Sequence, residues 1–295
     1  MTLDISLALS GGGARGHAHI GVIRRLEEEG FRIRAIAGTS AGGLIGALYA
    51  AGYTPSQMED LSARINQSKL FGRSSKDGPS LLGLAGATRM LEEVLGQLTF
   101  ADLKIPCALV ATDIKSAREV VLNEGRVVDA VLAAIAVPAI LPPRRIGEYE
   151  LVDGAGVNPV PVSLARSMAP RLPVAAVVLT PQVGQNDKQV PMHAPRRFPG
   201  SLLSGLGRLR LVQAVNVYIH SADVTDRVLT ELRLRMEKPE AIIRPKVGGI
   251  GLLDRVDVHH VVRLGEKAVA EALPALRRAL SFPNRLHRNL FPLRT

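Results

Sequence analysis

The chain has 295 residues and carries 37 Lys and Arg against 27 Asp and Glu, which gives a formal net charge of +10. Hydrophobic residues make up 46% and charged residues 22%, a composition that excludes a wholly disordered or collagen-like chain. A single cysteine, Cys107, excludes an internal disulfide framework and a cysteine-based zinc site.

The first 52 residues alternate between predicted strands and helices. Apolar residues at helical spacing, such as Ile20, Ile23 and Leu26, predict a helix, and short apolar runs predict buried strands. The predicted order is a strand at 4–9, a glycine loop at 11–16, a helix at 17–29, a strand at 33–37, a turn at 38–42 and a helix at 44–51. This alternation is typical of an α/β domain with parallel strands.

The remainder of the chain continues the same pattern with longer gaps. A capping box at 54–57 begins a further helix. Other helices are predicted at 89–96, 127–136, 211–235 and 258–280, and strands at 106–112, 119–123, 151–153, 174–179 and 241–245. Residues 181–210 are rich in Pro, Gly, Ser and Arg and predict an irregular loop. No repeat or linker divides the chain, so we expect one domain over 3–280 and a basic tail over 281–295.

The composition and the apolar runs also predict where the chain resides. No basic segment followed by an apolar stretch opens the sequence, so we expect no secretory signal. The longest apolar run, 130–143, contains three prolines and is too short for a membrane-spanning helix. We therefore expect a cytoplasmic protein. Nucleic acid is not expected as a partner, because aromatic residues make up only 3% and no zinc-finger spacing exists.

A G-x-S-x-G motif, Gly38-Thr39-Ser40-Ala41-Gly42, lies between a predicted strand and a predicted helix. This is the setting of a nucleophile elbow, a sharp turn whose neighbouring glycines avoid clashes. The turn places Ser40 near a helix N-terminus, where the helix dipole favours developing negative charge. The motif predicts a catalytic serine.

The glycine loop at 11–16 allows two interpretations. Gly11, Gly13 and Gly16 fit the G-x-G-x-x-G fingerprint of dinucleotide sites, but the following strand ends without the acidic residue that would bind the ribose. Alternatively, the loop's backbone N–H groups form an oxyanion hole. Because parallel strands end at one edge of a sheet, the loop and Ser40 are expected to face the same crevice.

The base that would activate Ser40 is a separate question. None of the seven histidines lies in a setting typical of a catalytic triad, and no metalloprotease spacing exists. Asp153 ends a predicted strand and is followed by Gly154-Ala155-Gly156, which leaves room for a substrate beside the carboxylate. A carboxylate in that position can accept a hydroxyl proton.

These three pieces, in this order, resemble the patatin-like phospholipase family. Among its members the chain looks most similar to compact bacterial proteins related to neuropathy target esterase. The stretches at 19–22, 111–113 and 136–138 also match, and the resemblance covers about residues 3–280. It implies a three-layer α/β/α fold with a mostly parallel central sheet.

The resemblance also implies a Ser-Asp dyad without a catalytic histidine, in which Ser40 is the nucleophile and Asp153 the proton acceptor. The implied oxyanion hole lies in the loop of Gly11, Gly12, Gly13, Ala14 and Arg15, with the N–H donors expected from Gly12, Gly13 and Ala14. Motif support comes from Gly16, Gly38, Gly42, Gly154 and Ala155. The implied reaction is calcium-independent hydrolysis of acyl esters of phospholipids or lysophospholipids, with no metal and no cofactor. The competing classes are a dinucleotide-dependent oxidoreductase and a catalytically silent membrane-binding protein.

The excess positive charge lies in two segments, 188–212 and 272–295, each with five basic residues and no acidic one. Both also carry apolar residues. They are interpreted either as solvated basic loops or as a peripheral contact with an anionic membrane. The sequence leaves the oligomeric state open.

Overall fold

The computed structural model of the chain describes residues 3–65, 70, 72, 80–184, 202–281, 283–284 and 288, without the side chains of 202–213, 215 and 216. The strands are β1 (Leu3–Leu9), β2 (Phe31–Thr39), β3 (Cys107–Asp113), β4 (Arg118–Leu122), β5 (Arg144–Ile146), β6 (Tyr149–Asp153), β7 (Val174–Val177) and β8 (Ala241–Ile243). The helices are α1 (Ala18–Glu28), α2 (Ala41–Ala51), α3 (Pro55–Arg64), α5 (Ala85–Leu95), α6 (Val127–Ala134), α7 (Val162–Met168), α8 (Leu202–Glu237) and α9 (Val258–Ala279). Short 3-10 turns are η1 (Gly13–His17), η2 (Phe100–Asp102) and η3 (Gly154–Gly156).

The described strands form one mixed sheet in the order β5-β6-β3-β2-β1-β7-β8, with β4 also paired to β3. The pairs β3–β2, β2–β1, β1–β7 and β7–β8 are parallel, whereas β4, β5 and β6 pair antiparallel. The centre of the sheet is therefore parallel and one end is antiparallel. This confirms the predicted α/β class with a mostly parallel sheet.

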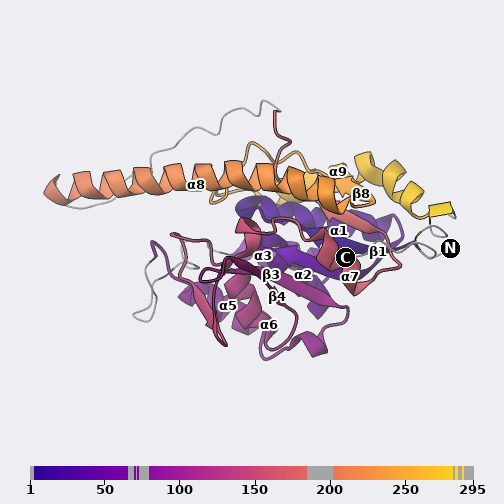
Figure 1. The fold of residues 1–295 in the computed structure, drawn as a ribbon, viewed down its shortest axis with the longest axis horizontal. Coiled ribbons are helices and arrows are strands. Elements are labelled where there is room, and N and C mark those ends of the chain that lie inside the picture. The colour runs from indigo at the N-terminus through magenta and orange to yellow at the C-terminus, as the bar shows by residue number, and fades with distance from the viewer. Residues whose placement is uncertain are drawn as a thin grey trace.

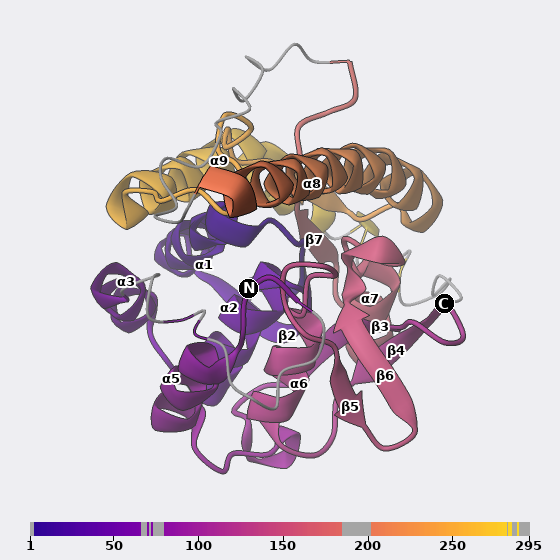
Figure 2. The ribbon, with the colours of Figure 1, turned by 90° about the vertical axis from the view of Figure 1, so that its left-hand side faces the viewer.

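Alternating side chains of the central strands separate two apolar cores. Leu7 and Leu9 of β1 pack into the larger core with residues of α1, α2, α6 and α9. Ala8, which lies between them, packs into a smaller core with Val162 and Ala165 of α7 and Leu234 of α8. Helices thus cover both faces of the sheet, as the predicted three layers require. In both views α8 runs along one side of the body, and α5 and α6 lie on the opposite side (Figure 1, Figure 2).

The register around β3 brings two distant parts of the chain together. β4 pairs with residues 109–113 along one edge of β3. The opposite edge is shared in succession by β2, which pairs with 107–110, and β6, which pairs with 111–113. Thr39 is paired with Val110, and Asp153 is paired with Ala111, the next residue of β3. The end of β6 therefore lies directly beyond the end of β2, where Ser40 begins the turn.

The structure corrects several boundaries. The irregular loop predicted for 181–210 is wrong in its last part, because α8 already begins at Leu202. The glycines in that stretch suggested a loop, but the helix continues through them into the predicted 211–235 segment. The hairpin strand β5 and the helix α7 have no counterpart in the prediction, and α2 begins at Ala41 rather than at residue 44. Residues 185–201 lie outside the described part of the chain.

The length and hydropathy of the helices show whether any of them could span a membrane. Among them, no helix is both long enough and apolar enough to span a bilayer. The 36-residue α8 has the length but carries charged residues throughout its second half.

Candidate active site

Ser40 occupies a sharp, strained turn between β2 and α2. Its backbone has φ 52° and ψ −125°, a combination that L-residues rarely adopt, and it is the N-cap residue of α2. The turn is so close-packed that a Cβ on Gly38 would lie 2.5 Å from the carbonyl oxygen of Gly42, and a Cβ on Gly42 would overlap the carbonyl of Leu9. Both glycines are therefore required by the close approach of backbone to backbone, as the G-x-S-x-G pattern predicts.

The side chain of Ser40 lies next to the carboxylate of Asp153 and favours its charged form. Both residues are buried, with 7% and 5% of their surface exposed. Burial raises the pKa of Asp153 to about 6, because a charged carboxylate is poorly solvated there, while the Ser40 side chain and the Ala155 N–H oppose this rise. At neutral pH the carboxylate is therefore ionised, and it is a stronger base than an exposed aspartate.

Three backbone contacts fix the position of Asp153. Its N–H donates to the carbonyl of Ala136 at 3.0 Å, and its own carbonyl accepts from Thr112 Oγ1 at 3.1 Å. The Ala155 N–H donates to its Oδ1 at 2.9 Å, and a Cβ on Gly154 would overlap the carbonyl of Val110. The sequence stretches around 111–113 and 136–138 thus hold the backbone of Asp153 from two sides, and the Ala155 N–H holds its carboxylate.

The glycine loop lies against the same turn. A Cβ on Gly11 would lie 3.4 Å from Ser40 Cβ, and a Cβ on Gly16 would lie 2.5 Å from Ala41 Cβ. The glycine loop and the Ser40 turn therefore lie side by side at the ends of β1 and β2, as expected for parallel strands that end at one edge of the sheet.

The N–H groups of the five residues in the predicted oxyanion loop divide into two groups. The N–H groups of Gly11, Ala14 and Arg15 donate to the carbonyls of Pro159, Leu252 and Gly12, at 3.1, 2.8 and 3.1 Å. Among the hydrogen bonds of the described residues, none uses the N–H groups of Gly12 and Gly13. These two N–H groups are the ones left to bind a ligand oxygen.

Arg15 ties the loop to the second half of the chain. Its side chain is 3% exposed, its Nε donates to the carbonyl of Ile250 at 2.6 Å, and a terminal nitrogen lies 3.0 Å from Asp223 Oδ1. Asp223 lies on α8 and also pairs with Arg227 at 2.7 Å. The buried ion pair and the hydrogen bond to Ile250 together hold the guanidinium in one position.

A further carboxylate of α8, Asp226, faces the same region. Its Oδ1 is buried and has no hydrogen-bond partner among the described residues. Burial and the charges of Asp223 and Asp153 together raise the pKa of Asp226 to about 7, while Arg15 and Arg227 oppose the rise. Asp223 and Asp226 were missed by the sequence analysis, because no motif connects α8 to residues about 200 positions earlier.

Histidines occupy supporting positions. Nε2 of the fully buried His19 is hydrogen-bonded to the carbonyl of Ser10 at 2.9 Å, and burial lowers the pKa of His19 to about 4. His17 Nδ1 is hydrogen-bonded to the carbonyl of Ala14 at 2.9 Å. Within the described residues, no hydrogen bond joins a histidine to Ser40 or Asp153. Nor do three or more His, Cys, Asp or Glu residues gather there as a metal would require.

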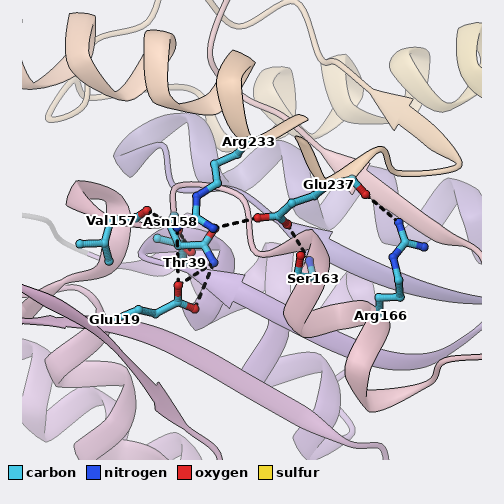
Figure 3. A network of polar contacts seen from close by, with 8 residues as sticks. All are labelled: Thr39, Glu119, Val157, Asn158, Ser163, Arg166, Arg233 and Glu237. Atoms are coloured by element: carbon cyan, nitrogen blue, oxygen red, sulfur yellow. Dashed lines mark hydrogen bonds and ion pairs between the residues drawn. The ribbon is translucent and has the colours of Figure 1, made fainter. Parts of the chain in front are cut away.

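A polar network next to the dyad joins the segment after Asp153 to the residue before Ser40 (Figure 3). Thr39 Oγ1 donates to the carbonyl of Asn158 at 2.7 Å, and Asn158 Nδ2 donates to both carboxylate oxygens of Glu119 at 3.1 Å. Arg233 of α8 donates to the carbonyl of Val157 at 2.8 Å. The network braces both ends of the dyad against β4 and α8.

The structure describes the two basic segments, 188–212 and 272–295, only in part. Residues 185–201 and most of 282–295 lie outside the described part of the chain. Of the rest, Arg277 pairs with Glu29 at 3.1 Å and Arg288 is buried, with 8% of its surface exposed. These two side chains are thus engaged with the protein itself, and membrane contact by 188–212 and 272–295 stays a prediction.

Fold and site together define an α/β protein with a buried serine at a strand-to-helix turn, next to a buried aspartate. Residues 7–166 match the sequence profile described as "Patatin-like phospholipase", more than half of the chain. The chain belongs to the patatin-like phospholipase family, which confirms the resemblance noted in the sequence.

Individual relatives agree with this assignment. The chain is 33% identical over 164 residues to an uncharacterized NTE family protein of Mycobacterium tuberculosis (strain ATCC 25618 / H37Rv), covering 54% of this chain and 44% of that protein. It is 27% identical over 301 residues to lysophospholipase NTE1 of Pyricularia oryzae, covering 93% of this chain and 19% of that protein. The chain therefore spans less than half of the length of either relative.

Among solved structures, VipD from Legionella pneumophila superposes with a TM-score of 0.56 at 12% sequence identity. The match covers 93% of this chain and 67% of VipD, and at this identity it shows the fold alone.

Proposed function

We propose that this chain hydrolyses acyl esters of phospholipids or lysophospholipids, with Ser40 as nucleophile and Asp153 as proton acceptor. The observation that carries the proposal is the buried Asp153 carboxylate next to the Ser40 side chain at the strained turn. Family membership and the likeness to a protein named lysophospholipase support the substrate class.

The geometry supports a two-step reaction. Asp153 accepts the proton of Ser40 Oγ as that oxygen attacks the ester carbonyl, and the N–H groups of Gly12 and Gly13 stabilise the resulting oxyanion. Protonated Asp153 then gives its proton to the leaving alcohol, and an acyl-enzyme remains on Ser40. Water, deprotonated by Asp153, attacks the acyl-enzyme and releases the fatty acid, and the proton returns to Ser40.

The direct test measures hydrolysis of a lysophospholipid and of a short p-nitrophenyl ester by the wild type, Ser40→Ala and Asp153→Asn. Both variants are expected to lose activity by at least about a thousandfold, since each removes a group that takes part in the bond changes. Full activity of Ser40→Ala would sink the proposal.

Two other classes of function are separated by simple measurements. A catalytically silent protein with this fold would not react with a fluorophosphonate probe, whereas an activated Ser40 would be labelled and Ser40→Ala would not. A dinucleotide-dependent oxidoreductase would bind NAD in a titration. We expect no such binding, because the strand that follows the glycine loop ends at Thr39 without an acidic residue for the ribose.

A further inference from the structure

The outward side of α8 carries a row of exposed apolar side chains. Val217, Val224, Val228, Leu232 and Met236 are each 46–76% exposed. Arg235 is also exposed, and it follows Val217 by 18 residues, or about five helical turns, so both lie on the same side of the helix. We call these six residues the outer face of α8.

The acidic side chains of α8 do not belong to the outer face, because they contact other residues of the protein or are buried. Asp223 pairs with Arg15 and Arg227. Glu231 pairs with Arg244 at 2.9 Å. Glu237 accepts from Arg233 and from the Ser163 N–H. The remaining acid, Asp226, has a buried carboxylate oxygen. The outer face is therefore apolar with one cation and no anion, which is the charge pattern that an anionic surface attracts.

The spacing of the apolar residues distinguishes a flat surface from a partner helix. Val224, Val228, Leu232 and Met236 follow one another at intervals of four residues. Each step turns by about 40° around the helix, so the row spreads over roughly 120° instead of following the narrow 3.5-residue seam of a coiled coil. An exposed apolar face that also carries positive charge is typical of helices that lie in the interface of a bilayer.

The inner side of the same helix reaches the candidate active site. Asp223 of α8 holds Arg15, which belongs to the glycine loop beside Ser40. A surface bound to the outer face would therefore lie about one helix diameter, roughly 10 Å, from that loop. A lipid bilayer in this position would present ester substrates next to the site.

We propose that α8 docks this protein on anionic phospholipid bilayers through its outer face. The choice of a bilayer as the partner rests on the proposed lipid hydrolase function. The surface itself is distinct from the basic segments 188–212 and 272–295 suggested by the sequence. In the bound state the apolar side chains enter the boundary between head groups and acyl chains, and Arg235 contacts lipid phosphate.

The test measures co-sedimentation with vesicles of phosphatidylcholine, with and without phosphatidylglycerol, in a Ser40→Ala background. Turnover then plays no part, so a failure of docking is distinguishable from a failure of the proposed catalysis, which the ester assay reports separately. Val228→Asp is expected to weaken binding to the anionic vesicles by at least about tenfold, because it removes an apolar contact and adds a repelled charge. Val121→Asp on β4 is the matched control, since Val121 is 40% exposed and Val228 46%. It should bind as the parent does.

Arg235→Ala provides a second test of vesicle binding, and this variant places no new charge among the apolar side chains. It should reduce binding to anionic vesicles by about fivefold and leave binding to neutral vesicles unchanged. Thermal melts of all variants verify that they are folded. Three outcomes overturn the proposal: no binding of the parent to anionic vesicles, equal binding of Val228→Asp and the parent, or a parent dimer that Val228→Asp converts to a monomer. The last result would show that a second copy covers the face.

Discussion

Arg15 and Asp223 form a buried ion pair of 3.0 Å between the glycine loop and α8, although 208 residues separate them in the chain. Arg15 also donates to the carbonyl of Ile250, so the loop is held by both α8 and the segment before α9. The shape of the loop therefore depends on parts of the chain that lie far beyond the sequence motifs.

Asp223→Asn should leave the Arg15 guanidinium buried with a weaker partner. We expect a loss of unfolding free energy of roughly 3 kcal/mol, together with a fall in kcat as the Gly12 and Gly13 N–H groups shift. Chemical denaturation and ester hydrolysis measure the two effects. Glu231→Gln is the control, because Glu231 is ion-paired on the same helix but contacts Arg244 instead of the loop. An equal fall in kcat for both variants would contradict a specific role for the pair.

The pH dependence of activity follows from the pKa of Asp153, which burial raises to about 6. A protonated carboxyl cannot accept the Ser40 proton, so kcat/KM for a soluble ester should rise with pH and level off above about 7. A profile from about pH 4 to about pH 8 should give a midpoint near 6. A midpoint close to the ordinary aspartate value, or a flat profile, would rule out Asp153 as the base.

The same pKa predicts that the dyad costs stability. Because the pKa of Asp153 is about 6 in the folded chain and its ordinary value is 3.8, folded protein binds the proton more tightly, and stability falls as the pH rises through this window. Asp153→Asn, which carries no charge, should raise the unfolding free energy at pH 7 by about 1–3 kcal/mol. Chemical denaturation at about pH 4 and about pH 7 checks the direction of this effect. The stability gained by Asp153→Asn should be smaller at the lower pH.

Backbone strain at Ser40 gives a prediction that separates the side chain from the turn. Ser40→Ala and Ser40→Gly both remove the hydroxyl, but only glycine tolerates φ 52° without strain. The glycine variant should be about 1 kcal/mol more stable than the alanine variant, and both should be inactive. Ala117→Gly is the control, because Ala117 also has a positive φ, of 55°, and lies outside the site. It should gain stability and keep its activity.

The contact between Asn158 and Glu119 can be tested by a charge change and its rescue. Asn158→Asp places a second carboxylate against Glu119, where the amide now donates at 3.1 Å, and should cost about 2–3 kcal/mol and lower kcat. Adding Glu119→Gln should restore most of both losses. In a double-mutant cycle the coupling energy should therefore be clearly different from zero, and additive effects would show that the network does not act through this pair.

Local sequence patterns were sufficient for the parts of the site that local geometry determines. Ser40 was placed correctly at a strand-to-helix turn because the glycine spacing is imposed by backbone contacts within that turn. Within the oxyanion loop the sequence predicted donors from Gly12, Gly13 and Ala14, but the Ala14 N–H already donates to the carbonyl of Leu252. Which of the loop's N–H groups are already engaged depends on the carbonyls of Pro159 and Leu252, which no pattern in the loop encodes.

The features that the sequence did not predict depend on contacts between distant parts of the chain. Nothing near Asp153 indicates that β6 continues the edge of β3 occupied by β2, because that depends on strand register. The beginning of α8 was missed because Gly205 and Gly207 favour a loop when helix propensity alone is considered. The role of Asp223 was missed for a related reason, since a helix contributes here to a site made by loops elsewhere.

The shared edge of β3 also determines when the chain first acquires its dyad. During synthesis the turn at Ser40 and its parallel strands emerge more than 100 residues before Asp153. Under the proposed mechanism, the serine has no partner to take its proton until the β5–β6 hairpin docks beyond β2. A newly made or partly unfolded chain is thus expected to be inert toward the lipids around it, and ester hydrolysis would report completion of this one strand pairing.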